Sequence, residues 1–476
     1  MPSTFQLEFS GYQAERSAFW DDIATQPFNS LGGYYHRWLT YVYRLAIPEG
    51  ARVLEVGCGI GNLISALKPS IGIGVDFSSR MIQEARRRHS DIQFVVADAH
   101  ELDLGDHDFD FIILSDLIND VWDLQRIFEQ LTPYCSSSTR IILNYFSHLW
   151  QTPLSIARQF RLATPTLTQN WFTRHDVENL LELSGYQPLR CWEEIIVPLR
   201  IPLLSTFSNR FLARIAPFRW LALTNFLVAR PSPAFSPSPR VSVVVAARNE
   251  QGHVDELIER IPEMGRGTEI VFVEGNSTDD TWGTIQRAIA ANPQRNCKLL
   301  KQPGKGKGDA VRTGFEAATG DILVILDADI TVPPEDLPRF FDILVSGQGE
   351  FANGVRLVYP MQDDAMRFFN LIGNKVFSWA FSWLLGQPIR DTLCGTKALW
   401  AKDYQRLAAN RAYFGDFDPF GDFDLLFGAA KLNLKIMEAP IRYRARRYGS
   451  TNIQRWRHGL LLARMVLFAA RRIKFV

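Results

Sequence analysis

Cysteine, net charge and long apolar runs are all scarce in this sequence, and each scarcity argues against a class of protein. The five cysteines (Cys58, Cys135, Cys191, Cys297 and Cys394) are scattered and form no CxxC pair. This pattern argues against a disulfide framework or a zinc site and fits a reducing compartment. The formal net charge of +1 gives no overall field for nucleic acid, so we expect no nucleic-acid partner.

The sequence also lacks the segments that would take it into or across a membrane. It has no run of about 18 apolar residues, which is roughly the length that spans a bilayer. The first residues, MPSTFQLEFS, lack the basic and then apolar stretches of a secretory signal. We therefore expect a cytoplasmic protein.

Two segments are basic and apolar, and neither contains an acidic residue. Ten Lys or Arg and no Asp or Glu lie between Ala439 and the last residue. Residues 195–230 carry Arg200, Arg210, Arg214, Arg219 and Arg230, again without an acid. Such asymmetry indicates a phosphate-bearing or anionic partner. Each segment could be a helix packed on its own domain or a peripheral contact with the inner face of a membrane, and both interpretations stay open.

The length and one proline-rich stretch indicate two domains. A chain of 476 residues is too long for one ordinary core and long enough for two. The segment PSPAFSPSP at 231–239 favours extended backbone and cannot form a packed element. We expect a first domain at 1–230, a linker at 231–240 and a second domain at 241–476.

Alternating strands and helices in both halves predict an α/β fold with parallel, doubly wound sheets. Expected strands in the first half lie at 53–56, 71–75, 93–96, 109–114 and 140–145, with helices from about 62, at 78–88 and at 121–130, and a last strand at 221–228. Expected strands in the second half lie at 241–246, 270–273 and 322–326, with helices at 251–261, 279–291 and 307–318.

The first half contains the elements of a nucleoside-binding site. In VLEVGCGIGN, Glu55 and three glycines follow a strand, where glycine lets the backbone turn tightly and approach a ligand. About 20 residues later, GVDF places Asp76 at the end of the second strand, where a carboxylate can accept ribose hydroxyls. Asp98 follows the third strand, where it could receive an adenine amino proton.

Residues 40–150 therefore resemble the class I S-adenosylmethionine-dependent methyltransferases, with a Rossmann-like fold. A dinucleotide fold that binds NAD is the alternative. The resemblance implies that Ser115 and Asp116 face the methyl acceptor, and a base is needed only if this acceptor is a hydroxyl. Asp116, His148 and His175 are the candidates for that base. The resemblance also implies cofactor-binding residues: Glu55, Gly57, Gly59, Gly61, Asp76, Phe77, Asp98 and Ala99.

The second half contains the elements of a phosphate and metal site. Arg248–Asn249–Glu250 and then Glu274 lie at successive strand ends, and PGKGKGDAV supplies cations and free amides before a helix. Asp327 and Asp329 flank one residue just beyond an apolar strand. Two such carboxylates suit Mg²⁺ or Mn²⁺ bridging a diphosphate.

Residues 241–450 resemble the family 2 glycosyltransferases of GT-A fold, particularly polyprenyl-phosphate mannosyl- and glucosyltransferases. The resemblance implies a nucleotide-sugar donor that contacts Ala246, Arg248, Glu250, Glu274, Lys305, Lys307, Asp327 and Ala328. It implies Asp327 and Asp329 as metal ligands, and Arg356, Arg367 and Lys397 as partners of an acceptor phosphate. Asp391, Asp422 and Asp424 are candidates for a base or for binding donor hydroxyls.

The second half departs from this family at a few positions. Ala246 replaces the usual proline, and Glu274–Gly275–Asn276–Ser277 replaces the usual paired Asp with Gly-Ser, which leaves the donor base open. Cys394, where the family often has serine, is interpreted as a packing residue.

The sequence as a whole predicts a bifunctional enzyme. The first domain would transfer a methyl group from S-adenosylmethionine, and the second would transfer a sugar with inversion, with a polyprenyl phosphate as acceptor. The alternative is a glycosyltransferase that acts on a glycan or glycolipid hydroxyl, with the first domain as a scaffold or sensor.

Overall fold

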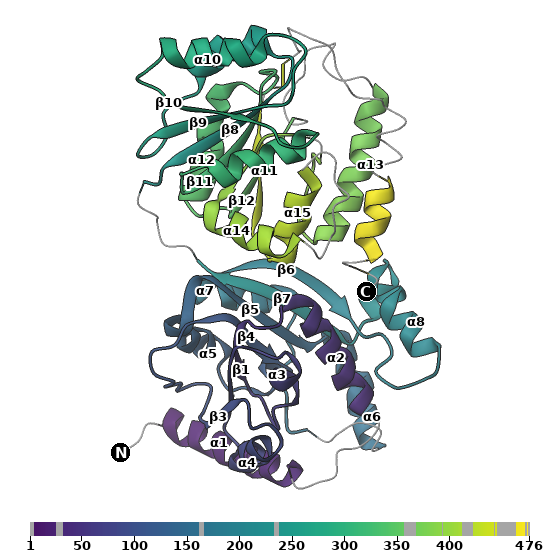
Figure 1. Ribbon diagram of the computed structural model, residues 1–476. Helices are drawn as coiled ribbons and strands as arrows, with labels where there is room; N and C mark the ends of the chain where they lie inside the picture. The colour runs from purple at the N-terminus through teal and green to yellow at the C-terminus, as the bar shows by residue number, and fades with distance from the viewer. Residues whose placement is uncertain are drawn as a thin grey trace. The chain divides into compact units, whose positions relative to one another are not determined.

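The chain divides into two compact units, Met1–Ser232 and Pro233–Val476. The computed structural model (Figure 1) describes residues 4–24, 32–160, 166–232, 238–356, 368–392, 394–411, 422–441, 443–444, 463–471 and 474.

The first unit is built on a seven-stranded sheet of order β3-β2-β1-β4-β5-β7-β6. Strands β1 to β5 run parallel, and β7 is antiparallel to both of its neighbours. The strand order reverses between β1 and β4, and ligands of doubly wound sheets bind at the carboxyl ends of the strands at such a point. The strands are β1 (Arg52–Val56), β2 (Ile71–Asp76), β3 (Gln93–Val96), β4 (Phe109–Ser115), β5 (Cys135–Phe146), β6 (Tyr186–Glu194) and β7 (Thr224–Pro231).

Helices cover both faces of this sheet, which explains why its central strands are apolar on both sides. Buried residues of α5 and α7 pack with Leu54 and Ile112 on one face, whereas those of α2, α3 and α4 pack with Val53 and Ile113 on the other. The helices are α1 (Thr4–Ile23), α2 (Gly32–Ala46), α3 (Asn62–Ala66), α4 (Ser79–Arg88), α5 (Leu124–Leu131), α6 (Gln151–Gln159), α7 (Arg174–Leu183) and α8 (Leu204–Arg210).

The second unit contains another seven-stranded sheet, of order β10-β9-β8-β11-β13-β12-β14. Strands β10, β9, β8 and β11 run parallel, and β13 is antiparallel to β11 and β12. Here the order reverses between β8 and β11. The strands are β8 (Val241–Ala247), β9 (Thr268–Glu274), β10 (Asn296–Lys301), β11 (Ile322–Asp327), β12 (Phe351–Val355), β13 (Lys397–Trp400) and β14 (Ile436–Pro440).

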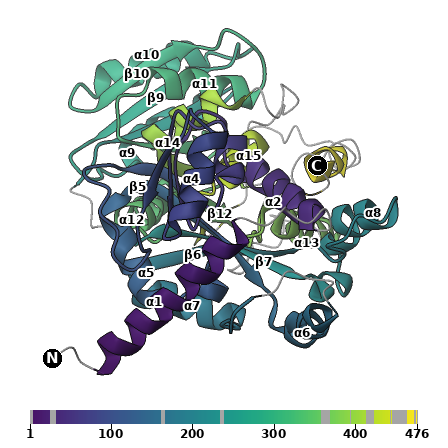
Figure 2. The same cartoon turned by 90° about the horizontal axis from the view of Figure 1, so that it is seen from below.

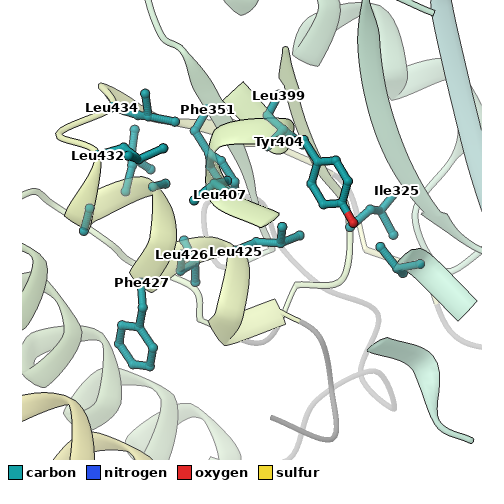
Figure 3. Packing of buried hydrophobic residues seen from close by; sticks show 14 of the residues in the cluster. Ile325, Phe351, Leu399, Tyr404, Leu407, Leu425, Leu426, Phe427, Leu432 and Leu434 are labelled. Atoms are coloured by element: carbon teal, nitrogen blue, oxygen red, sulfur yellow. The ribbon is translucent and has the colours of Figure 1, made fainter. Parts of the chain in front are cut away.

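The second sheet is also enclosed by helices on both faces. Figure 3 shows the packing on one face, where Leu407, Leu425 and Leu426 lie against Ile325 and Leu399 of the sheet. Helices α9, α10 and α12 cover the opposite face. The helices are α9 (Val254–Arg260), α10 (Thr281–Ala291), α11 (Lys307–Ala317), α12 (Leu337–Val345), α13 (Phe368–Leu385), α14 (Ala401–Ala409) and α15 (Asp422–Lys431), and residues 463–471 are also helical.

The α/β fold class expected from the sequence is confirmed in both units, and most expected elements end within a few residues of the observed ones. Helix α5 begins at Leu124 instead of residue 121, because the Asp123 side chain accepts a hydrogen bond from the Arg126 amide and caps it. The sequence predictions omitted α1, α2, α6, α7, α12 to α15, β6, β10 and β12 to β14. None of the helices in the described part of the chain is long and apolar enough to cross a membrane.

Candidate cofactor and sugar-donor sites

Glu55 and Asp76 lie at the ends of β1 and β2, beside the point where the first sheet reverses its order. The Glu55 carboxylate accepts a hydrogen bond from the Ile64 amide of α3 at 3.0 Å. The two oxygens of Asp76 accept from the Gly59 and Ser78 amides, both at 2.9 Å. Backbone amides therefore hold both carboxylates at the carboxyl edge of the sheet.

Burial dominates the protonation of these two acids. The side chains are almost fully buried, and the loss of hydration raises the pKa of Glu55 to about 8 and that of Asp76 to about 6. A buried acid of this kind favours a cationic or hydrogen-bonding ligand, because such a ligand replaces the lost water.

The glycine-rich turn after β1 leaves room for a ligand at one position and for packing at another. Gly59 has φ +51°, and a Cβ there would meet nothing within 4 Å. Gly61 has φ +76°, and a Cβ there would lie 2.5 Å from the Phe94 ring. Side chains rarely adopt such backbone angles, so both positions favour glycine. The residues fit a nucleoside cofactor, because open space at Gly59 adjoins the Asp76 carboxylate.

Asp98 follows β3 and is hydrogen-bonded to a residue of α1, the first helix of the chain. One oxygen accepts from the His100 amide at 2.8 Å and from its ring Nδ1 at 2.6 Å, and the other accepts from Gln13 of α1 at 2.5 Å. Burial works to raise the pKa of Asp98, but the hydrogen bonds from His100 and Gln13 outweigh it and lower the pKa. Ser78 likewise donates to Asp21 of α1 at 2.5 Å. Phe77 and Ala99 lie next to these residues and are partly buried.

Asp116 lies directly after β4 in a strained backbone conformation with φ +53°. Its Oδ1 accepts from the Tyr35 hydroxyl at 2.7 Å and from the Asn144 amide at 2.5 Å. Burial raises the pKa of Asp116, and the nearby His36 works against this rise. A carboxylate in such an environment has the properties of a general base, and partly buried Ser115 precedes it.

The two histidines proposed as alternative bases lie elsewhere. His148 and His175 are exposed, and both act electrostatically on Asp176, in the capping box at the start of α7. The sequence predictions missed three side chains around Asp116, which are Tyr35, His36 and Asn144. Tyr35 and Asn144 lie 81 and 28 positions from Asp116 in the sequence, and no local motif marks contacts over such separations.

Asp327 is the last residue of β11 and forms an ion pair with Lys307, the first residue of α11. The Lys307 Nζ lies 2.5 Å from an Asp327 oxygen, and both side chains remain about a quarter exposed. Gly395 lies against this pair, because a Cβ there would lie 2.1 Å from Asp327 Oδ2 and 2.2 Å from Lys307 Nζ. The structure thus brings together the aspartate, the lysine loop and the glycine of the IRDTLCGTK segment.

Asp329 lies two residues further and is partnered by Thr331, whose hydroxyl donates to Oδ1 at 2.8 Å. Burial, and then the neighbouring Asp327, raise the pKa of Asp329. Among the residues that the structure describes, no group of three or more His, Cys, Asp or Glu could hold a metal ion by itself. Two carboxylates nevertheless fit Mg²⁺ or Mn²⁺, because such ions are commonly bound by one or two carboxylates together with substrate phosphates.

A pocket of about 510 Å³ opens beside the end of β9. The Glu274 carboxylate accepts from the Ser277 amide at 2.5 Å within it. The sequence predictions had included Glu274 but missed Trp282 and Lys301, which bring an aromatic ring and a cation to the pocket. Its lining consists of Glu274, Asn276, Ser277, Asp279, Trp282 and Lys301.

The other predicted nucleotide-sugar residues differ in exposure. Arg248 and Lys305 are exposed, Ala246 is partly buried and Ala328 is buried. Glu250 is also buried, and its carboxylate contacts the His253 ring at 3.1 Å. Arg248 and Lys305 are thus available to an anionic ligand, whereas Glu250 contacts its own helical turn.

The predicted acceptor residues form ion pairs and buried contacts. Arg356 binds Asp391 with two hydrogen bonds, Nε to Oδ2 at 2.7 Å and Nη2 to Oδ1 at 2.8 Å, and the Asp391 side chain is fully buried. Lys397 is fully buried, with its ammonium donating to the Cys394 carbonyl. Asp424 accepts from Arg411 at 2.8 Å.

The side chains of two predicted residues are not among those that the structure describes, and the side chain of Cys394 is buried. Arg367 lies outside the described residues, and for Asp422, the first residue of α15, only the backbone is described. Cys394 is buried, and burial raises its pKa to about 11, which disfavours the thiolate of a nucleophile.

Two segments of the chain match known protein families. Residues 53–136 match the family described as "Methyltransferase domain", and residues 242–404 match "Glycosyl transferase family 2". Both resemblances seen in the sequence are thereby confirmed. The chain carries a methyltransferase domain followed by a family 2 glycosyltransferase domain that resembles polyprenyl-phosphate glycosyltransferases.

Curated relatives match part of this chain. A dolichol-phosphate mannosyltransferase of Pyrococcus furiosus is 33% identical over 144 residues, which is 30% of this chain and 36% of that protein. An undecaprenyl-phosphate 4-deoxy-4-formamido-L-arabinose transferase of Klebsiella pneumoniae is 29% identical over 168 residues, or 34% of this chain and 50% of that protein. The chain thus spans between about a third and half of the length of these relatives.

Two solved structures are similar to parts of the chain. A glucosyl-3-phosphoglycerate synthase from Mycobacterium tuberculosis, in complex with Mn²⁺, uridine diphosphate and glucosyl-3-phosphoglycerate, is 20% identical with a TM-score of 0.36. The similarity covers 49% of this chain and 80% of that one. An S-adenosylmethionine-dependent methyltransferase from Mesorhizobium loti is 20% identical, with a TM-score of 0.32 and coverage of 41% and 97%.

Proposed function

We propose that the chain is a bifunctional enzyme, an S-adenosylmethionine-dependent methyltransferase joined to a metal-dependent inverting glycosyltransferase that transfers a sugar from a nucleotide-sugar to a polyprenyl phosphate. The proposal is carried by one observation, which is that both sheets place paired acids at the edge where their strand order reverses. In the first sheet amides hold these acids, and in the second Lys307 pairs with one of them.

The first unit would bind and orient its reactants. Glu55 and Asp76 would hold the amino-acid and ribose parts of the cofactor, and Asp98 its adenine. S-adenosylmethionine supplies an activated methyl group on a sulfonium, so positioning of the acceptor accounts for most of the catalysis. Asp116, held by Tyr35 and Asn144, would take the proton of a hydroxyl acceptor.

The second unit would bind the donor diphosphate beside Asp327, Asp329 and Lys307. A bound divalent ion supplies positive charge to the diphosphate leaving group. Lys307, which pairs with Asp327, would contact the same diphosphate, and Glu274, Trp282 and Lys301 would hold the nucleoside in the neighbouring pocket.

A phosphate acceptor agrees better with the surroundings of Asp391 than a sugar hydroxyl does. A hydroxyl acceptor needs a base, yet both oxygens of Asp391 accept hydrogen bonds from Arg356. A phosphate is already ionised and needs none. Both curated relatives described above are named as lipid-phosphate sugar transferases, which supports the same choice.

For the first unit, the test is calorimetric titration of the full chain with S-adenosylmethionine. We expect saturable heat from the natural protein and at least about a tenfold weaker affinity for Asp76→Ala, because a charge-assisted hydrogen bond contributes roughly 1.5–3 kcal/mol. Leu183→Ser, on the outer side of α7, is the control and should bind normally. An absence of heat from the natural protein would instead indicate a scaffold.

For the second unit, the test is Asp329→Ala assayed with nucleotide-sugars and Mn²⁺ or Mg²⁺. We expect transfer to an added polyprenyl phosphate to fall at least about a hundredfold, since the metal contributes several kcal/mol to charge stabilisation. Titration of the same variant with S-adenosylmethionine should be unchanged, which separates a lost site from a misfolded chain. Full glycosyl transfer by Asp329→Ala would contradict the metal assignment.

A further inference from the structure

The segment between β6 and β7, residues 195–223, has an inverted pattern of burial. Its α8 helix buries Ser205, Ser208 and Asn209 at 2%, 3% and 0% exposure, whereas Leu204 and Phe207 on the same helix are 51% and 54% exposed. A helix on the surface of a water-soluble domain normally does the reverse. This pattern favours a helix whose outer side meets an apolar partner.

The exposed apolar side chains gather in this one segment, which we name the apolar platform. Of the 21 large apolar residues that are exposed in the described part of the chain, ten lie within the 23 positions from Leu199 to Leu221. Scattered exposed residues need no explanation, but a group of this size marks an interaction site. The ten are Leu199, Ile201, Leu203, Leu204, Phe207, Phe211, Ile215, Phe218, Trp220 and Leu221.

The platform is a folded structure, because its own polar groups fix the backbone. The Asn209 side chain accepts from the Ile196 and Val197 amides, both at 2.9 Å, and donates to the Val197 carbonyl at 2.9 Å. The Arg214 guanidinium forms an ion pair with buried Glu194 at the end of β6. These contacts hold the turns in place while the apolar side chains point outward.

One residue of the platform is held in a strained conformation at its most exposed point. Leu203 has φ +64° and is 88% exposed. A leucine in the left-handed region costs free energy, and such strain persists where the surrounding structure and a function maintain it. Figures 1 and 2 both show the adjoining helix α8 at the outer edge of the first unit, away from its sheet.

The arginines of the apolar platform indicate which kind of apolar partner suits it. The segment 195–223 contains four arginines and no acidic residue, and one of the four, Arg214, pairs with Glu194. Arg200 and Arg210 are exposed next to Leu199 and Phe211. Phenylalanine, tryptophan and arginine side by side suit the boundary between lipid head groups and acyl chains, where aromatic rings lie between water and hydrocarbon and arginine meets phosphate.

We propose that the apolar platform docks the first unit on the surface of an anionic lipid bilayer. Leu203, Phe207 and Trp220 enter the interfacial layer, and Arg200 lies at the level of the lipid phosphates. The inference concerns a surface of the methyltransferase domain and goes beyond the proposed function, because it depends on neither reaction.

The test is flotation of the full chain with vesicles of phosphatidylcholine alone or mixed with phosphatidylglycerol. We expect binding to the mixed vesicles, weakened by salt because screening reduces the attraction of arginine to phosphate. The double variant Leu203→Ser/Phe207→Ser should lower the bound fraction at least about tenfold, since each change removes a large apolar side chain. Leu183→Ser, which alters a leucine of similar exposure on α7, is the matched control and should bind normally.

A local measurement separates the platform from the basic C-terminal segment. Hydrogen–deuterium exchange of the full chain should show protection of residues 199–221 by the mixed vesicles, and the double variant should lose it. Arg200→Glu should bind more weakly than the natural protein at low salt and equally at high salt. Equal vesicle binding by natural and double-variant protein would overturn the proposal. So would a dimer in sedimentation analysis that the double variant dissociates while vesicles leave residues 199–221 unprotected.

Discussion

The two units place carboxylates at the same position in similar sheets, yet they neutralise them in opposite ways. In the first, Glu55 and Asp76 are buried and held by backbone amides, which carry only partial charges. In the second, Asp327 pairs with the full charge of Lys307 and stays partly exposed. Amides preserve a fixed shape for an organic ligand, whereas a lysine can be exchanged for another cation. The partner of the acid, more than the sheet, would therefore distinguish the proposed cofactor site from the proposed metal site.

The largest expected effect comes from removing that exchangeable charge. In Lys307→Met, glycosyl transfer should fall about a hundredfold, because a cation aimed at a diphosphate stabilises developing charge by roughly 3 kcal/mol. Kinetics at saturating metal would measure it. Lys305→Met, two residues away and exposed, is the comparison and should lose much less. Equal losses in the two variants would show that the ion pair has no special role.

A smaller effect is expected from Gly395→Ala, which changes no charge. The added methyl group would lie 2.1 Å from Asp327 Oδ2 and 2.2 Å from Lys307 Nζ, so both side chains must shift away from it. We expect transfer to fall about tenfold, since displacements of an ångström commonly cost this much or more. The matched change in the first unit is Gly59→Ala, where the new Cβ meets open space and should weaken S-adenosylmethionine binding instead. Unchanged kinetics for Gly395→Ala would mean that the pair tolerates rearrangement.

The smallest expected effect is on stability and follows from the raised pKa of Glu55, about 8 against 4.5 for an ordinary glutamate. A carboxyl group whose pKa is higher in the folded state contributes stability that is lost as the pH rises toward 8. Between pH 6 and 7 this amounts to about 1 kcal/mol, or about 2–4 °C in melting temperature. Glu55→Gln keeps an oxygen for the Ile64 amide and should melt with a weaker pH dependence. Parallel pH profiles for the two proteins would contradict the raised pKa of Glu55.

The sequence predicted the framework of both sites because parallel strands covered on both faces are short apolar runs. The run Val241–Ala247 is followed directly by Arg248, and the run Ile322–Asp327 ends in an aspartate, so each strand and its candidate site residues were located together. The glycines after β1 marked the turn for the same local reason. A local sequence pattern was sufficient to locate a structural feature wherever that feature consists of one strand and the turn that follows it.

What the sequence could not predict depends on residues that meet only after folding. Gln13 reaches Asp98 across 85 positions, and Tyr35 reaches Asp116 across 81. Nothing in the sequence around Asp391 indicated that Arg356, directly after β12, would bind both of its oxygens. The 195–230 segment was expected to contain an amphipathic helix before a last strand. The structure instead divides it into α8 and short turns before β7, and α8 buries polar side chains in place of apolar ones.

The ion pair of Lys307 and Asp327 also bears on turnover in the proposed reaction. Lys307 is the first residue of α11, so its backbone is fixed and its Nζ remains within reach of the aspartate. After each round, the lysine can return to Asp327 as the spent nucleotide departs. The re-formed ion pair would take the place of the cation that held the diphosphate at Asp327, which would favour product release in the proposed reaction.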